Sequence, residues 1–171
     1  RGWLDYEKLK SHRQDLIYLN LVGDRHGGSA LDYTVNSKVG LPFLSGEGLR
    51  GDSLSGNKKE PVNNPFPAWD VIAGQSIALG LLAAERYRRI NGEGQFVKLA
   101  LADVALATMG HLGYIAEAEV NGEPRQPMGN HIFGTFGHDF ACSDGRRVMI
   151  VGVSPNQWKA TASSGSDAIS A

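Results

Sequence analysis

The sequence of 171 residues has one cysteine, almost no net charge and no long apolar run. Cys142 cannot form a disulfide within the chain, and no stretch reaches the ~18 consecutive apolar residues of a membrane span. Lys and Arg total 17 against 18 for Asp and Glu, which gives a formal net charge of -1. This balance favours neither nucleic acid nor an anionic membrane as a partner. We therefore expect a globular, cytoplasmic protein that binds neither.

The sequence also lacks the common motifs of phosphate, serine-hydrolase and metal chemistry. It contains no P-loop with Gly-Lys-Ser/Thr, no Gly-x-Ser-x-Gly, no His-Glu-x-x-His and no Cys-x-x-Cys. A metal site is therefore not expected. Residues 46–51 match Gly-x-Gly-x-x-Gly, but a polar loop follows where a dinucleotide-binding motif requires a helix. A dinucleotide cofactor is therefore not expected either.

Apolar patterns alternate between strand and helix types along the first two thirds of the chain. Residues 15–22 form an apolar run closed by Gly23, as in a buried strand, and residues 96–101 alternate apolar and polar side chains. Residues 71–90 and 103–119 have helical patterns, and apolar side chains cover nearly every face of the first helix, which indicates burial. This order predicts an α/β fold, part of a Rossmann-like domain with a parallel sheet.

The pattern changes after residue 120 and predicts the start of a smaller α+β domain. Two apolar runs flank the turn sequence at residues 143–145, which favours a hairpin, and a helix is expected to begin at Pro155. We assign residues 1–120 to part of a large α/β domain and residues 121–171 to the start of a small β-rich domain. The chain opens without methionine and stops in a run of small polar residues, which predicts an internal segment of a longer protein.

Asp70 stands at the start of the most apolar helical segment, directly after Trp69. Free backbone N–H groups and the positive end of the helix dipole stabilise an anion at this position. One interpretation is an ordinary helix N-cap, for which aspartate is a preferred residue. The other is a carboxylate nucleophile, which must be ionised, fixed in direction and shielded from water, with Trp69 as the shield. Asp32, just beyond a glycine-rich loop, is a second acidic candidate with the same helix-cap alternative.

Several segments, in order and at matching spacing, resemble the class III CoA-transferase family, also called the CaiB/BaiF type. Residues 67–74 (PAWDVIAG), 81–86 (LLAAER) and 92–98 (GEGQFVK) resemble its central signature, and residues 144–148 (DGRRV) resemble its small-domain segment. The resemblance extends from the first residue to about residue 160. It implies a homodimeric enzyme that acts on an acyl-CoA thioester and a carboxylate, with CoA as a substrate moiety and no further cofactor.

Carried over residue by residue, the resemblance implies catalytic roles for Asp70 and Asp32. Asp70 matches the family's nucleophilic aspartate, which attacks the thioester carbonyl and forms an aspartyl-acyl anhydride. Residues 32–36 (DYTVN) are most similar to members that move CoA between the two carboxyl groups of one branched unsaturated diacid. Four further residues are assigned to substrate or CoA binding, the last two in a loop over the acyl group: Trp69, Asn36, Gly134 and Gly137.

Two alternatives to this function stay open. Racemases of the same family move the α-proton of a 2-methylacyl thioester with a histidine and an aspartate, but Leu31 stands where they carry the histidine. A segment that binds acyl-CoA without turnover is the other alternative, because the family's N-terminal CoA-binding segment does not occur in these residues.

Overall fold

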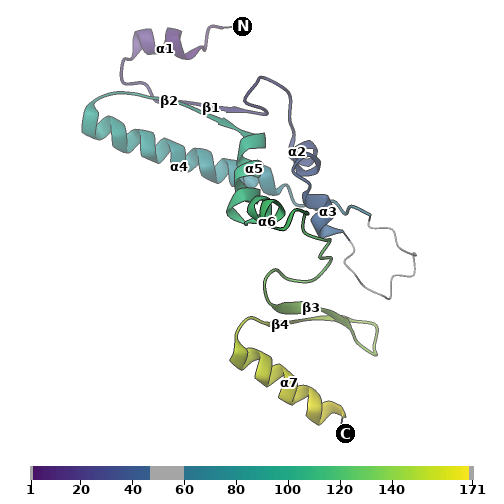
Figure 1. Ribbon diagram of the computed structural model, residues 1–171. Helices are drawn as coiled ribbons and strands as arrows, with labels where there is room; N and C mark the ends of the chain where they lie inside the picture. Colours follow the sequence, from purple (N-terminus) through teal and green to yellow (C-terminus); the bar gives the residue numbers. More distant parts are fainter. Residues whose placement is uncertain (1, 47–59, 170–171) are drawn as a thin grey trace. The chain divides into compact units, whose positions relative to one another are not determined.

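The apolar runs predicted as strands form two two-stranded sheets in a computed structural model that describes residues 2–46 and 60–169 (Figure 1). Contacts divide the chain into two units, of which the first contains residues 1–41 and 64–125 and the second residues 42–63 and 126–171. The predicted division between residues 120 and 121 stays a prediction. The elements are α1 (Tyr6–His12), β1 (Tyr18–Val22), α2 (Asp32–Lys38), α3 (Leu41–Ser45), α4 (Ala68–Asn91), β2 (Phe96–Ala100), α5 (Leu101–His111), α6 (Tyr114–Asn121), β3 (Phe136–Ala141), β4 (Arg147–Gly152) and α7 (Pro155–Ile169).

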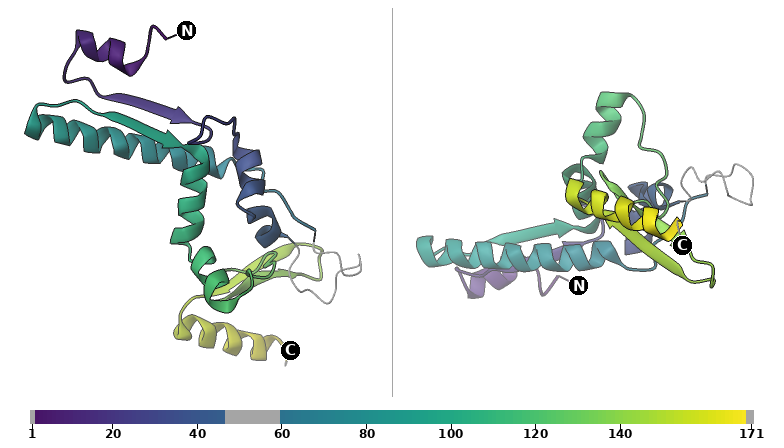
Figure 2. Two further views of the ribbon diagram at one scale, coloured as in Figure 1. Left: turned by 45° about the horizontal axis from the view of Figure 1, so that its top comes forward. Right: turned by 90° about the horizontal axis from the view of Figure 1, so that it is seen from below.

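The first unit is built on a parallel strand pair. β1 pairs with β2 in parallel, with Tyr18 opposite Phe96 and Val22 opposite Ala100. Parallel strands need a crossover connection. The long helix α4 lies between the two strands in the sequence and runs back along both of them (Figure 2, left). In β2, Phe96 and Lys98 are more exposed than Val97 and Leu99, as the alternation predicts. The α/β fold with a parallel sheet is confirmed.

Helix α4 is longer and less buried than its sequence predicts. It spans Ala68–Asn91 where residues 71–90 were expected, and Gly92 follows its last turn. The expected burial of all faces is wrong, because the strand pair with α2 and α5 covers only one side of the helix in the described residues. Its buried residues are Trp69, Ala73 and Ala84. Three large side chains stay about two-thirds exposed: Leu79 at 68%, Leu82 at 65% and Ile90 at 67%.

The core of the first unit gathers around α5, which packs against α2, α4 and β2. The sequence predicts one helix over residues 103–119, whereas the structure has α5 and α6 with a break at Gly113 (φ 81°), a backbone conformation that favours glycine. The buried apolar side chains that join these elements are Val35, Leu101, Val104, Ala105 and Met109. This packing holds α2 beside the first turns of α4.

The second unit contains the predicted hairpin. β3 and β4 pair antiparallel with Phe136 opposite Gly152, and α7 packs on β4 with the Trp158 ring 4.7 Å from that of Phe136. Asp139 accepts hydrogen bonds from Arg147 on the facing strand and from Asn130. The hydrogen bond from Arg147, and to a lesser extent that from Asn130, lowers the pKa of the Asp139 carboxyl to about 2. The helix expected at Pro155 also begins there.

Candidate active site

Asp70 is the third residue of α4, and its side chain is exposed. The N-cap position belongs to Pro67, which has no side-chain acceptor, so the N-cap interpretation of Asp70 is wrong. Among residues 2–46 and 60–169, no donor forms a hydrogen bond with the Asp70 carboxylate. The carboxylate therefore lies in the first turn, near the positive end of the helix dipole, with its oxygens open to an incoming group.

The acceptor for the first turn of α4 comes from another helix. Asp32 Oδ2, at the start of α2, accepts the backbone N–H of Trp69 at 2.8 Å and that of Asp70 at 3.0 Å. The N–H of Ala68 donates to the carbonyl oxygen of Phe66 at 2.8 Å. Each of the first three N–H groups of α4 thus has an acceptor, as buried or half-buried helix starts require. Asp32 is only 5% exposed, and it acts as a cap for α4 rather than for its own helix.

A second hydrogen bond joins the same two helices one turn further along α2. The indole Nε1–H of Trp69 donates to Asn36 Oδ1 at 3.0 Å, and both side chains are 3% exposed. Asp32 and Asn36 are four residues apart and therefore lie on one face of α2. Together they fix the backbone and the indole at the start of α4. The binding roles assigned to Trp69 and Asn36 stay predictions.

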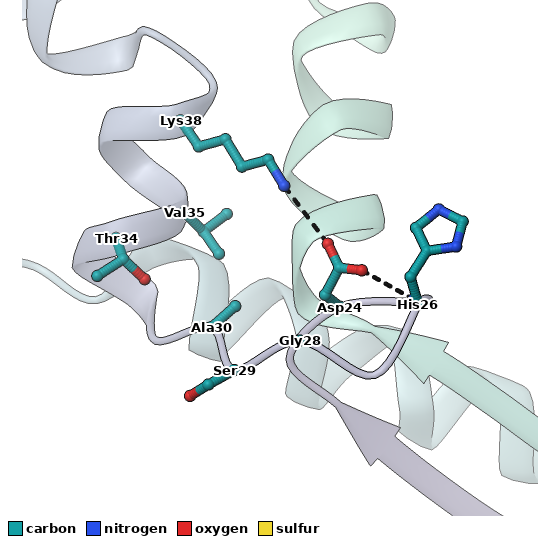
Figure 3. A pocket seen from close by; sticks show the side chains of 8 residues that line it. All are labelled: Asp24, His26, Gly28, Ser29, Ala30, Thr34, Val35 and Lys38. Carbon is teal, nitrogen blue, oxygen red and sulfur yellow. Dashed lines mark hydrogen bonds and ion pairs between the residues drawn. The ribbon is translucent and has the colours of Figure 1, made fainter.

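The opposite face of α2 lines an open pocket of about 510 Å³ (Figure 3). Thr34 and Lys38 of α2 and the loop after β1 form its walls, and Lys38 Nζ lies 3.4 Å from Asp24 Oδ2. The backbone N–H of His26 and, less strongly, the Lys38 ammonium hold the pKa of the Asp24 carboxyl below its ordinary value. The pocket lies beyond the carboxyl end of β1, where open α/β sheets usually bind ligands.

Sequence reasoning did not single out this pocket, although a signal for it exists. The loop at residues 23–28 is rich in glycine and follows a strand directly, which is typical of loops that approach a ligand closely. A Cβ atom at Gly23 would lie 2.4 Å from the backbone nitrogen of Ala30, so the loop can fold back only over glycine. This close approach shapes the pocket wall.

The structure brings together four of the six predicted site residues, all in the first unit: Asp32, Asn36, Trp69 and Asp70. The other two, Gly134 and Gly137, belong to the second unit. Gly134 has φ 73° in the turn before β3, and a Cβ atom at the buried Gly137 would lie 2.6 Å from the side chain of Ile132. Local packing therefore accounts for Gly137, and the binding roles of both glycines stay predictions.

In the described part of the chain, no three His, Cys, Asp or Glu side chains come together as a metal site would require. No helix there has the length and apolarity to cross a membrane. The Gly-x-Gly-x-x-Gly match at residues 46–51 lies, apart from Gly46, outside the described residues.

Curated relatives match nearly the whole chain. It is 56% identical over 160 residues to 2-methylfumaryl-CoA isomerase of Chloroflexus aurantiacus, a match that covers 94% of this chain and 37% of that protein. It is 26% identical over 165 residues to succinyl-CoA:mesaconate CoA-transferase of Haloarcula marismortui, covering 91% of this chain and 39% of that protein. The chain thus spans less than two fifths of the length of these relatives.

Solved structures share the fold. A CAIB/BAIF family protein from Brucella suis matches with a TM-score of 0.69 at 24% identity, over 86% of this chain and 38% of that one. Rv3272 from Mycobacterium tuberculosis matches with a TM-score of 0.62 at 21% identity, over 91% and 38% of the two chains. The sequence profile of CoA-transferase family III matches residues 1–167. Since this match covers almost every residue, the chain belongs to CoA-transferase family III.

Proposed function

We propose that the whole protein containing this chain moves CoA between the two carboxyl groups of 2-methylfumarate. The observation that carries this proposal is the 56% identity, over 94% of the chain, to a 2-methylfumaryl-CoA isomerase. Mesaconate is another name for 2-methylfumarate, so the name of the 26% identical transferase refers to the same diacid. The names of both relatives support a thioester of a branched, unsaturated dicarboxylic acid as the substrate, with CoA as a substrate moiety. That no further cofactor takes part is an additional element of the proposal.

Asp70 is the proposed nucleophile. Its carboxylate is exposed, whereas Asp32 beside it is buried and already accepts two backbone N–H groups. The first turn of α4 adds a favourable field for a carboxylate and for the negative charge that develops on an attacked carbonyl oxygen. These features support Asp70 as the group that attacks the substrate.

The reaction then proceeds by exchange of carboxyl and thiolate groups. A carboxylate oxygen of Asp70 attacks the thioester carbonyl, the C–S bond breaks, and a mixed anhydride and CoA thiolate form. The thiolate attacks the Asp70 carbonyl of the anhydride, which gives an aspartyl thioester and the free diacid. The second carboxylate of the diacid attacks this thioester and releases the thiolate again. Attack of the thiolate on the acyl carbonyl of the new anhydride yields the isomeric thioester and restores Asp70.

The open pocket beside α2 is the proposed binding place for the pantetheine arm of CoA, which carries the thioester. Its lining includes the small residues Gly28, Ser29 and Ala30, which leave room for an extended chain. We extend the proposal to a homodimeric enzyme that works in the cytoplasm. Size measurement and cell fractionation test these two parts separately.

The test uses the full-length protein with the C1 thioester of 2-methylfumarate. We expect CoA to appear on C4 without any added free acid, and Asp70→Asn to reduce the rate by several orders of magnitude while the fold persists. Asp144→Asn, in an exposed turn of the second unit, serves as the matched control and is expected to retain activity. Normal activity of the Asp70→Asn variant would contradict the proposed nucleophile.

The 26% identical transferase favours a second candidate function, in which CoA passes between two different acids. Isotope-labelled free 2-methylfumarate separates the two: label enters the thioester during intermolecular transfer and stays in the free acid during intramolecular transfer. A separate incubation of the protein with a 2-methylacyl thioester in deuterated water tests the racemase alternative. We expect no rapid α-deuteration, because Leu31 provides no base.

A further inference from the structure

Asp32 forms two hydrogen bonds with the backbone of the helix turn that carries Asp70. Its Oδ2 accepts the N–H of Trp69 at 2.8 Å and the N–H of Asp70 itself at 3.0 Å. We infer that Asp32 is a positioning residue, which holds the first turn of α4 so that the Asp70 carboxylate points away from its own backbone. The inference rests on the proposed role of Asp70 as nucleophile and replaces the catalytic role predicted for Asp32.

Burial argues against direct chemistry at Asp32. The residue is 5% exposed, and one of its two carboxylate oxygens, Oδ2, is fixed by two backbone donors at ordinary hydrogen-bond lengths. An acid or base must come within hydrogen-bond reach of the proton that it transfers. Asp70 has the opposite environment, with an exposed side chain and no donor to its carboxylate among the described residues. The two aspartates thus divide into a fixed, buried acceptor and an open one.

The cap has a consequence for the nucleophile. Aspartate side chains readily accept hydrogen bonds from nearby backbone N–H groups, above all at the start of a helix. With Asp32 on the N–H groups of Trp69 and Asp70, those donors are already occupied. The Asp70 carboxylate therefore gains no hydrogen bond by turning back towards these N–H groups. Removal of Asp32 frees both donors next to the nucleophile and allows that turn.

Helix α2 also ties this arrangement to the pocket. Asp32 and Asn36 face α4, whereas Thr34 and Lys38 on the opposite face line the pocket (Figure 3). The packing of α2 is fixed by Val35, which is 1% exposed. A bond from α2 to the first turn of α4 therefore sets the direction of Asp70 relative to one pocket wall.

The experiment compares Asp32→Asn, Asp32→Ala and the exposed control Asp144→Asn in the full-length protein. Asparagine keeps an acceptor oxygen of the same reach, and it caps helices about as well as aspartate, whereas alanine provides no acceptor. We expect kcat for CoA migration to stay within about tenfold of the native value in Asp32→Asn. In Asp32→Ala we expect a loss of about 100-fold in kcat at nearly constant KM, because a misplaced nucleophile slows the chemical step.

Amide hydrogen exchange supplies a readout that does not depend on activity. Faster exchange at Trp69 and Asp70 is expected in Asp32→Ala, and near-native exchange in Asp32→Asn. If Asp32→Ala fails to fold, Asp32→Asn alone decides the matter. Loss of kcat by several orders of magnitude in folded Asp32→Asn would overturn the inference, since it would show that the ionisable group itself takes part.

The outcome is distinguishable from failure of the proposed function. Activity retained in Asp70→Asn would refute the nucleophile and, with it, the reason for positioning. Activity lost in Asp70→Asn and also in Asp32→Asn would agree with Asp70 as the nucleophile and refute only the positioning role of Asp32. Equal rates in Asp32→Ala and the native protein would likewise refute the positioning role.

Discussion

The hydrogen bond from Trp69 to Asn36 predicts an energetic coupling between α4 and α2 that a double-mutant cycle can measure. Trp69→Phe removes the donor and leaves Asn36 Oδ1, in a side chain 3% exposed, without that bond. Asn36→Ala removes the acceptor and leaves the indole N–H without it. Each single change costs about 1–3 kcal/mol for the buried group left behind, in addition to lost packing. The double variant leaves neither group behind, so it costs less than the sum by about 1 kcal/mol or more.

Urea unfolding of the full-length variants gives the four free energies of unfolding, provided that the slope with urea stays constant across the cycle. Trp3→Phe with Asn36→Ala forms the matched control cycle, because Trp3 is 73% exposed and lies outside this contact. The control pair is expected to be additive. Additivity of Trp69→Phe and Asn36→Ala within about 0.3–0.5 kcal/mol would refute the assignment of this hydrogen bond as a link between the helices.

Three further predictions concern the second unit and the chain as a whole. The carboxyl group of Asp139, followed by the NMR chemical shift of its carboxyl carbon, is expected to titrate near pH 2 rather than near the ordinary 3.8. Its ion pair with Arg147 therefore stabilises the hairpin above pH 4, and this stabilisation is lost as the pH falls towards 2. A titration midpoint near 4 would contradict this. Gly137→Ala is expected to lower the midpoint of thermal unfolding, because the added Cβ would lie 2.6 Å from the Ile132 side chain, and an unchanged midpoint would show that this side chain moves aside. Residues 1–171 expressed alone are expected to associate and to lack transferase activity, because large apolar side chains of α4 are exposed; a monomer with a sharp unfolding transition and full turnover would contradict this.

The sequence was sufficient for the parts of the fold that depend on local pattern. The alternation at residues 96–101 and the turn at residues 143–145 predict a strand and a hairpin, and both occur as β2 and as β3 with β4. The break between α5 and α6 was missed, because a glycine within a helical pattern does not reveal that it takes a positive φ. The burial of α4 was overestimated, since periodicity shows which faces are apolar but not which neighbours cover them.

The candidate site was predictable as a set of residues but not as an arrangement. Asp70, Asp32, Asn36 and Trp69 were all selected, and the structure places them together. One interpretation of the sequence was that each aspartate caps its own helix. Instead, Asp32 caps the helix that carries Asp70, a contact across 37 to 38 positions that no local pattern indicates. Such long-range contacts arise from packing, here of α2 and α4 around α5.

The central claim is that Asp70 becomes acylated during turnover, and trapping with hydroxylamine tests it most directly. The full-length protein is mixed with the 2-methylfumaryl thioester, quenched with hydroxylamine during turnover, digested and analysed by mass spectrometry. Since hydroxylamine cleaves an aspartyl anhydride or thioester, we predict a hydroxamate on Asp70 that requires substrate and disappears in Asp70→Asn. CoA migration at full rate without any modification of Asp70, or with the hydroxamate on Asp32 instead, would contradict the account.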